Sequence, residues 1–298
     1  MPELPEVETV ARGLQAAVAG RHIVSVTLGK TDFIDNPAEV ERELPGRTIR
    51  AVERYGKFML LRLTGIDGPR GAAQAALLVH LGMTGMLAPR AAAELHAKHT
   101  HVVMLLDDGR ELRYVDPRRF GRMAYLEGEA LQRELLRFGA DPLDAGFADF
   151  LKRISGRKTH VKALLLDQKV LRGVGNIYAD ESLWTAKIHP AKRGANLREP
   201  QMKLLYRSLQ AILRDAILKR GSTISDFVDA DGQAGGYQQH HKVYGREGEK
   251  CFRCTTVIRR GIVAGRSSFY CVTCQTPPRG WRIGAPGKSR TMRKKNKG

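Results

Sequence analysis

The sequence predicts an α+β fold with a β-rich first half, a helical second half and a small metal-bound hairpin near its end. Short apolar runs separated by Gly, Asp and Pro fill residues 22–128, and helical spacing of apolar residues replaces them from about Glu129. Two Cys-x-x-Cys pairs follow. A chain of 298 residues, of which 42% are hydrophobic, is long enough for two ordinary domains with their own cores.

The chain opens with MPELPEVETV, which predicts a helix from Pro5 to about Val18. Proline is tolerated in a first helical turn, and Glu6 lies where the helix dipole favours a carboxylate. The apolar face of this helix is formed by Val7, Val10, Leu14 and Ala17. A second interpretation stays open, because removal of Met1 would leave a prolyl amine beside Glu3, which is a nucleophile next to an acid.

Residues 22–128 contain the apolar runs HIVSVTL, FMLLRL, AALLVHLG, HVVMLL and RMAYL. No helix-length pattern interrupts them, so we expect a mainly antiparallel β sandwich or barrel. The turn DDG at 107–109 lies between HVVMLL and RELRYV, which predicts a hairpin. The Gly- and Pro-containing stretch 65–75 predicts a flexible loop.

Helical periodicity marks the next part of the chain, with a boundary or interhelical turn at 139–146. The segment LRGVGNIYADESLW places Gly173 and Gly175 between two helical patterns. This is typical of a helix–hairpin–helix in which glycine amides approach a phosphate and Asn176 caps the following helix. An ordinary glycine-rich turn is the alternative, whereas the missing third glycine excludes a dinucleotide site.

The four cysteines form two close pairs separated by sixteen residues, at Cys251, Cys254, Cys271 and Cys274. Four thiolates at this spacing predict one structural zinc ion. Two disulfides or a redox motif are the alternatives, but there is no secretion signal and a redox motif would not be doubled. The segment between the pairs predicts a β hairpin that depends on the metal, with Arg259, Arg260 and Arg266 available for phosphates.

The chain is strongly basic, with 50 Lys and Arg residues against 31 Asp and Glu and a net charge of +19. The segment 286–298 holds six of the basic residues and no acid, so the rest of the chain still carries +13. This charge favours a nucleic-acid partner, with an anionic membrane surface or an acidic protein as alternatives. No apolar run approaches twenty residues and residues 1–20 do not form a secretion signal, so we expect no membrane span and a cytosolic location.

Two turns combine exposed apolar and basic residues. HLGMTG at 80–85 places Met83 between glycines, and LRYVDPRRFGR at 112–122 places Arg118 and Phe120 at the end of a strand. An apolar side chain beside arginine can enter a duplex and fill a gap in the base stack. Taken alone, Met83 and Phe120 could equally be core residues.

Together these motifs resemble formamidopyrimidine-DNA glycosylase, the bacterial family that repairs oxidised purines. The matching segments, in family order, are PELPEVE at 2–8, GKFMLL at 56–61, HLGMTG at 80–85, KHTH at 98–101, YVDPRRFG at 114–121, GVGNIYADESL at 173–183, VYGREGEKC at 243–251 and FYCVTCQ at 269–275. The resemblance implies a β-sandwich domain with an N-terminal helix at 1–130 and a helix–two-turn–helix domain at 131–235. A zinc finger at 236–275 and a basic, disordered tail at 276–298 complete the expected organisation.

The resemblance also implies a bifunctional glycosylase and abasic-site lyase. Its nucleophile is the amine of Pro2, which is freed when Met1 is removed and forms a Schiff base with deoxyribose. Glu3 matches the general acid, and Glu6 a supporting carboxylate. Lys57 matches a catalytic lysine, and Arg266 an arginine that contacts phosphates and assists the β,δ-elimination.

The DNA-binding residues implied by the resemblance fall into two groups. Met83, Arg118 and Phe120 match the trio that fills the gap left by the everted base. His99, Arg157, Lys158 and Asn176 match positions that contact the DNA backbone. The stretch 230–241 corresponds loosely to the loop that covers an everted 8-oxoguanine.

The implied substrate is damaged double-stranded DNA, and the implied protein is a monomer of the bacterial cytosol and nucleoid. Two alternatives stay open. One is an endonuclease VIII-like glycosylase for oxidised pyrimidines, although that branch usually begins PEGPE and lacks the Met, Arg, Phe trio. The other is a zinc-containing DNA-binding protein without activity, which predicts loss of residues of the catalytic set, all of which are present.

Overall fold

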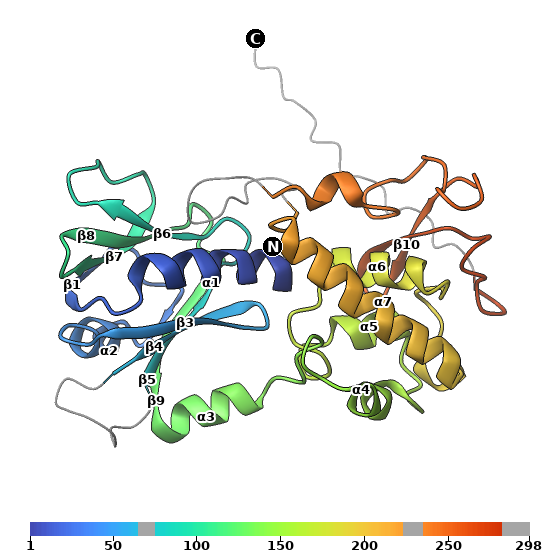
Figure 1. Cartoon of the computed structure of the whole chain (residues 1–298), viewed down its shortest axis with the longest axis horizontal. Helices are drawn as coiled ribbons and strands as arrows, with labels where there is room; N and C mark the ends of the chain where they lie inside the picture. Colours follow the sequence, from blue (N-terminus) through green and yellow to red (C-terminus); the bar gives the residue numbers. More distant parts are fainter. Residues whose placement is uncertain (65–74, 223–234, 282–298) are drawn as a thin grey trace, which may run out of the picture.

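A computed structural model describes residues 1–64, 75–222 and 235–281. The loop predicted at 65–75, the basic tail predicted at 276–298 and the first part of the stretch 230–241 lie largely outside the described residues. The α+β fold class is confirmed, with β strands in the first half and helices in the second (Figure 1). The predicted domain boundary at 130 falls inside a helix, and the domain limits stay predictions.

The described helices are α1 (Leu4–Val18), α2 (Pro37–Glu43), α3 (Gly128–Leu136), α4 (Phe147–Ile154), α5 (Val161–Leu166), α6 (Asn176–Thr185) and α7 (Glu199–Leu218). The described strands are β1 (Ile23–Leu28), β2 (Ile34–Asp35), β3 (Ile49–Tyr55), β4 (Phe58–Leu63), β5 (Ala75–His80), β6 (Met86–Ala91), β7 (Thr100–Leu106), β8 (Arg110–Val115), β9 (Arg122–Glu127), β10 (Arg259–Val263) and β11 (Arg266–Tyr270). Two short 3-10 helices lie at Gly194–Asn196 and Tyr237–His240.

The β half consists of two sheets with orders β1-β7-β8-β6 and β2-β9-β5-β4-β3. Their side chains enclose one apolar core that includes Leu61, Leu77, Val102 and Tyr114. The predicted hairpin is confirmed, since β7 and β8 pair antiparallel on either side of the 107–109 turn. The pairing is antiparallel except for the two residues of β2, which run parallel to β9.

The predicted first helix is confirmed as α1. Its residues Val7, Val10 and Leu14 are buried as expected, whereas Ala17 is only partly covered. The helix packs on β3 on one side and on α7 on the other. Its N-terminus therefore lies where the β half meets the helical half (Figure 1).

Two helices of the first half differ from the prediction. Helix α2 was not expected, because it has seven residues of which only Val40 is buried, so no helical periodicity is visible. Pro37 at its first position starts it. Helix α3 was expected with the helical half, but Leu131 and Leu135 pack against the five-stranded sheet.

Helices α4 to α7 form a second apolar core, which also contains Leu4 from α1. The hairpin β10–β11 predicted between the cysteine pairs is confirmed and packs on α6. Among the residues that the structure describes, no helix is long and apolar enough to cross a membrane.

Candidate active site and DNA-binding surfaces

A cavity of about 470 Å³ lies at the junction of the two halves, around the N-terminus of α1. The five predicted catalytic residues, Pro2, Glu3, Glu6, Lys57 and Arg266, all line it. Its other lining residues are Met1, Met83, Leu166, Gly175, Asn176, Ile177, Ser222 and Tyr244. Residues that are up to 265 positions apart in the sequence therefore meet at one site.

The carboxylate of Glu3 is fixed at the N-terminus of α6. The backbone N–H of Ile177 donates to Oε1 at 3.1 Å and the N–H of Tyr178 donates to Oε2 at 3.4 Å. The Cβ of an alanine at Gly175 would lie 2.2 Å from Cδ of Glu3, so only glycine leaves room for this carboxylate. The helix end stabilises the negative charge through its free N–H groups and its dipole.

One prediction about this turn is wrong. Asn176 does not cap α6, because Gly175 is the N-cap and the Asn176 side chain instead donates to the Ser267 carbonyl at 3.0 Å. The anion at this helix end in the structure is Glu3 of the same chain. The Gly173 amide donates to Gln168 Oε1 at 2.7 Å. Gly175 leaves room for Glu3 and Gly173 leaves room for Leu4, and the approach of a phosphate to this turn stays a prediction.

The second carboxylate, Glu6, is also buried and has three hydrogen-bond donors. Its Oε2 accepts from the Glu3 backbone N–H at 2.8 Å, and its Oε1 accepts from the Tyr178 hydroxyl at 2.5 Å and the Ser222 backbone N–H at 2.7 Å. Burial and the neighbouring Glu3 raise the pKa of Glu6 to about 7. This carboxyl group therefore exchanges its proton near neutral pH.

Burial also raises the pKa of Glu3, although Lys57 and the backbone N–H groups of Ile177 and Tyr178 oppose the shift. A raised pKa suits a carboxyl group that must donate a proton at neutral pH. Burial lowers the pKa of Lys57, and Arg266 adds to the effect. The cavity thus combines a proton-holding carboxyl group with an amine that loses its proton more easily.

The amino group in the structure belongs to Met1, so the nitrogen of Pro2 is part of a peptide bond. Burial lowers the pKa of the Met1 amino group, with Lys57 and Arg118 contributing in the same direction. The same surroundings would act on a prolyl amine exposed by removal of Met1. Neutral amine, the nucleophilic form, is therefore favoured at this end of the cavity.

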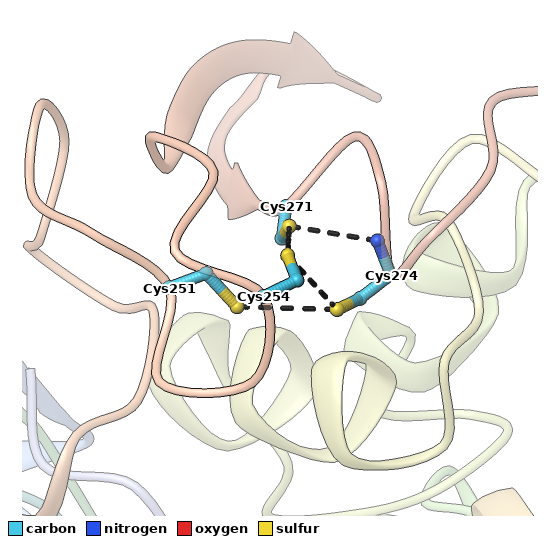
Figure 2. Close-up of side chains that lie close together, drawn as sticks. All are labelled: Cys251, Cys254, Cys271 and Cys274. Carbon is cyan, nitrogen blue, oxygen red and sulfur yellow. Dashed lines mark hydrogen bonds between the residues drawn. The ribbon is translucent and has the colours of Figure 1, made fainter.

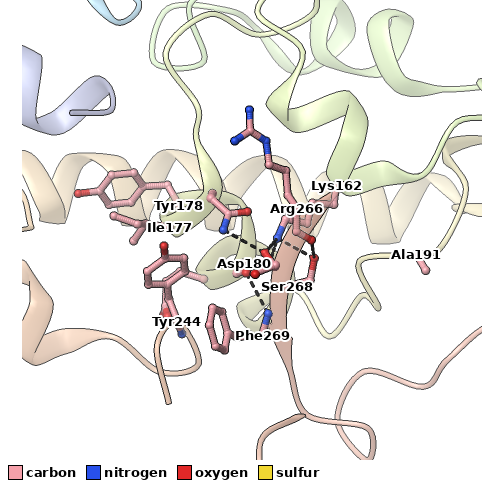
Figure 3. Close-up of polar contacts among 12 residues, drawn as sticks. Lys162, Ile177, Tyr178, Asp180, Ala191, Tyr244, Arg266, Ser268 and Phe269 are labelled. Atoms are coloured by element: carbon pink, nitrogen blue, oxygen red, sulfur yellow. Dashed lines mark hydrogen bonds and ion pairs between the residues drawn. The ribbon is translucent and has the colours of Figure 1, made fainter. Parts of the chain in front are cut away.

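Arg266 is held at the cavity by a buried ion pair behind it (Figure 3). Lys162 and Asp180 are both fully buried, and Lys162 Nζ lies 2.7 Å from Asp180 Oδ1. Lys162 also donates to the Ser267 carbonyl at 2.7 Å, and the backbone N–H of Phe269 donates to Asp180 Oδ2 at 3.0 Å. Because Ser267 and Phe269 belong to β11, the ion pair attaches the strand that begins with Arg266 to α5 and α6.

The three predicted wedge residues are exposed rather than part of the core. Met83 is 44% exposed and Phe120 is 57% exposed, which is unusual for large apolar side chains. The Arg118 guanidinium lies over the Phe120 ring at 4.5 Å from its centroid. These side chains project from two adjacent turns, and only Met83 also reaches the cavity lining.

The remaining predicted DNA contacts lie outside the cavity. His99, Arg157 and Lys158 are exposed, and His99 has a φ of 69° in the left-handed region. Their side chains are free to contact a polyanion, but their predicted roles stay predictions.

The four cysteines converge as predicted (Figure 2). Their sulfur atoms lie within 4.8 Å of one another, and three hydrogen-bonded pairs are 3.4, 3.5 and 3.9 Å apart. A tetrahedron of sulfurs about 2.3 Å from a metal has edges of about 3.8 Å, so the four thiols fit such an ion. They do not fit disulfides, whose sulfurs are about 2.05 Å apart.

Several residues of the site were not found from the sequence. Tyr178 and Ser222 hold Glu6, and Lys162 and Asp180 hold the hairpin. Lys162 lies within the apolar helical run VKALLL, and a lysine in such a run could have indicated a buried charge. Ser222 had none, because its contact with Glu6 uses only the backbone.

Comparison with family models gives two matches. The formamidopyrimidine-DNA glycosylase N-terminal domain matches residues 1–123, and the formamidopyrimidine-DNA glycosylase H2TH domain matches residues 138–228. The formamidopyrimidine-DNA glycosylases of Herpetosiphon aurantiacus and Geobacillus kaustophilus are each 42% identical to this chain. Each match covers 92% of this chain and 100% of the relative.

Solved structures give the same result. A Lactococcus lactis FPG mutant in complex with Fapy-dG-containing DNA has a TM-score of 0.84 and 33% identity, covering 93% of this chain and 100% of that one. The MutM (FPG) protein of Thermus thermophilus has a TM-score of 0.80 and 39% identity, covering 92% of this chain and 98% of that one.

Proposed function

The chain belongs to the formamidopyrimidine-DNA glycosylase family, and on this premise we propose that it excises oxidised purines from duplex DNA and cleaves the strand at the resulting abasic site. The observation that carries the proposal is the cavity in which Pro2, Glu3 and Lys57 meet beside Arg266. A non-catalytic DNA-binding protein would not need a buried pair of carboxylates at its N-terminus. The endonuclease VIII-like alternative is not favoured, since the relatives described above are formamidopyrimidine-DNA glycosylases.

We assign the chemistry to the first residues of the mature chain. After removal of Met1, the neutral amine of Pro2 attacks C1′ of the damaged nucleotide, and the bond to the base breaks as the sugar forms a Schiff base with Pro2. Glu3 gives its proton to the departing base, takes up the proton that the Pro2 nitrogen loses after the attack, and passes it to the ring oxygen as the ring opens, for which its raised pKa is suited. Glu6 holds the Glu3 backbone in place.

The later steps cut the strand. Proton abstraction from the sugar of the Schiff base leads to β-elimination of one phosphate and δ-elimination of the other. Lys57 is placed in the cavity to assist proton transfer, and its lowered pKa increases the fraction of neutral amine. Arg266 supplies positive charge for the phosphates around the lesion.

We propose that the metal held by the four cysteines is zinc. Four thiolates in a tetrahedral arrangement are typical of a structural zinc site, and they leave no position for a reacting water molecule. When bound, the ion supplies folding energy to a hairpin that is too small for its own core. The cysteines would thereby fix the hairpin that carries Arg266.

The proposed substrate is duplex DNA containing 8-oxoguanine or a formamidopyrimidine. Relatives of known structure bind Fapy-dG-containing and abasic-site-containing DNA, which supports this choice. The net charge of +19 is suited to a polyanion. The proposal includes a monomeric protein of the bacterial cytosol that associates with the nucleoid.

Borohydride trapping tests this proposal. The mature chain, with Met1 removal verified by mass spectrometry, is mixed with duplex DNA carrying 8-oxoguanine opposite cytosine and then reduced. We expect a covalent complex that is absent in Pro2→Gly and in a preparation that retains Met1. A folded, zinc-loaded protein without Met1 that gives no covalent complex would refute the proposal.

A further inference from the structure

Asp116 lies at the end of β8, directly before the turn that carries Arg118 and Phe120, and its carboxylate is fully buried. Its two oxygens accept four hydrogen bonds. Oδ1 accepts from the Thr84 hydroxyl at 2.6 Å and the Arg118 backbone N–H at 3.2 Å, whereas Oδ2 accepts from the Tyr114 hydroxyl at 3.2 Å and the Gly121 backbone N–H at 3.0 Å.

Three of these donors belong to the two turns that present the exposed wedge residues, and the fourth, the Tyr114 hydroxyl, belongs to β8. Thr84 follows Met83, and the N–H groups of Arg118 and Gly121 bracket the turn around Phe120. One buried carboxylate therefore joins both turns. The backbone N–H of Asp116 also donates to the His99 carbonyl at 3.1 Å, which connects both turns to His99, another predicted DNA contact.

The two turns also touch through their backbones. An alanine Cβ at Gly82 would lie 2.4 Å from the Phe120 carbonyl carbon, and one at Gly121 would lie 1.9 Å from the Tyr114 hydroxyl. Gly82 has a φ of 63°, which glycine adopts without strain. The two turns are thus in close contact beside Asp116, where Gly82 meets the backbone of Phe120.

The exposed side chains themselves have little else to hold them. Met83 and Phe120 project from the surface, and neither belongs to an apolar core cluster among the described residues. Side chains that must be ordered during binding reduce affinity, because they lose conformational entropy at that step. If the turns that carry these side chains are already rigid in the free protein, less conformational entropy is lost when DNA binds.

We propose that Asp116 is a positioning residue that joins the Met83 turn and the Arg118–Phe120 turn into one preformed wedge for base eversion. The inference rests on the proposed function and deepens it, because it names the group that holds Met83, Arg118 and Phe120 at fixed positions relative to one another. Asp116 touches neither the cavity nor the reacting atoms, so it acts only through these turns.

The ionisation state of Asp116 is consistent with this role. Burial alone would raise its pKa, but the hydrogen bonds from Thr84, Gly121 and Arg118 outweigh burial and hold the pKa below its ordinary value. The group is therefore a carboxylate at neutral pH and can accept all four hydrogen bonds at once.

Asp116→Asn tests the proposal with almost no change in shape. In either orientation of the amide, its NH₂ group replaces one oxygen and faces a backbone N–H, that of Arg118 or that of Gly121, so one hydrogen bond is replaced by a repulsive contact between two donors. The hydroxyl on the same side can turn and accept from the NH₂ group. Thr84→Val removes a single donor and should give a smaller effect in the same direction. Asp141→Asn is the matched control, because Asp141 is also a buried carboxylate that accepts a backbone hydrogen bond. Asp141 differs from Asp116 in that it pairs with the Arg54 side chain and does not contact the wedge turns.

The measurement is the rate of borohydride trapping on an oligonucleotide with a preformed abasic site, used as a single strand and as a duplex opposite cytosine. Only the duplex requires the wedge to fill a gap in the stack. We expect Asp116→Asn to lower the duplex-to-single-strand ratio at least tenfold, since a displacement of about 1 Å can cost about a hundredfold in rate. Asp141→Asn should lower stability but leave the ratio unchanged.

Each outcome is decisive. If Asp116→Asn lowers both rates equally, the residue is merely structural and the inference is wrong. If Asp116→Asn does not fold, Thr84→Val decides, because an unchanged ratio in that variant overturns the inference. In a Met83→Ala/Phe120→Ala background, Asp116→Asn should change the ratio no further. A wild-type protein that is trapped on neither substrate would refute the proposed function, and the inference with it.

Discussion

Gly175→Ala is expected to displace the Glu3 carboxylate and to leave the other active-site residues in place. Gly175 has a φ of −128°, so alanine introduces no backbone strain there. The new Cβ would lie 2.2 Å from Cδ and 2.4 Å from Oε1 of Glu3. The only change at this position is therefore steric pressure on one carboxylate.

The size of the effect follows from these distances. An ordinary contact begins at 3.4 Å, so the Glu3 carboxylate must move by about 1.2 Å. This displacement breaks the hydrogen bonds from Ile177 and Tyr178, which are 3.1 and 3.4 Å long. A hydrogen bond to a charged group contributes about 1.5–3 kcal/mol, so we expect a stability loss of about 3–6 kcal/mol for the two bonds. Misplacement of the acid by about 1 Å should lower base excision about a hundredfold.

Single-turnover excision of 8-oxoguanine and urea unfolding measure the two effects. Gly146→Ala is the matched control, because Gly146 is also a helix N-cap and an added Cβ there meets no atom within 4 Å. This control should lose less than about 1 kcal/mol of stability and keep its rate. The rate at which Gly175→Ala is trapped on a preformed abasic site should fall less than its rate of base excision, because no base has to leave from an abasic site.

Excision of 8-oxoguanine by Gly175→Ala at the rate of Gly146→Ala would contradict this prediction. An equal fall of the excision and abasic-site trapping rates would also contradict this prediction, because it would show that Glu3 limits ring opening and not base departure. A stability loss without a loss of rate would show that Glu3 caps α6 but does not donate the proton.

Three further predictions follow from the buried charges and the cysteines. Lys162→Met leaves Asp180 buried without its partner and should lower the free energy of unfolding by about 3–5 kcal/mol, whereas Lys162→Met/Asp180→Leu should recover part of the loss in urea unfolding. Glu6 has a folded-state pKa of about 7 against an ordinary 4.5, so its contribution to stability is full below pH 4.5 and is lost as the pH rises to 7. Glu6→Gln should remove the contribution of Glu6 to the pH dependence of the free energy of unfolding over this interval. An unchanged pH dependence would contradict the raised pKa of Glu6. Chelation of the metal, or Cys254→Ser, should abolish protection of the β10–β11 amides from hydrogen exchange and weaken DNA binding, while retained protection would argue against a structural metal.

Part of the site could be predicted from local sequence. The cysteine spacing predicted a metal-capable cluster, and the structure brings the four sulfurs together. Turn glycines and the DDG hairpin predicted β7 and β8 because turn chemistry is local. The short helix α2 could not be predicted, because one buried residue in seven leaves no periodic pattern.

The sequence by itself determined which chemical groups are present: a proline after the initiator methionine, two nearby glutamates, four thiols and an excess of positive charge. Only the tertiary structure decided how they are used. Gly175 leaves room for the Glu3 carboxylate and Gly173 leaves room for Leu4, and Asn176 binds the hairpin instead of capping its helix. The physical reason is that hydrogen bonds and burial depend on distances in space, and a helix end attracts whichever carboxylate the fold brings to it.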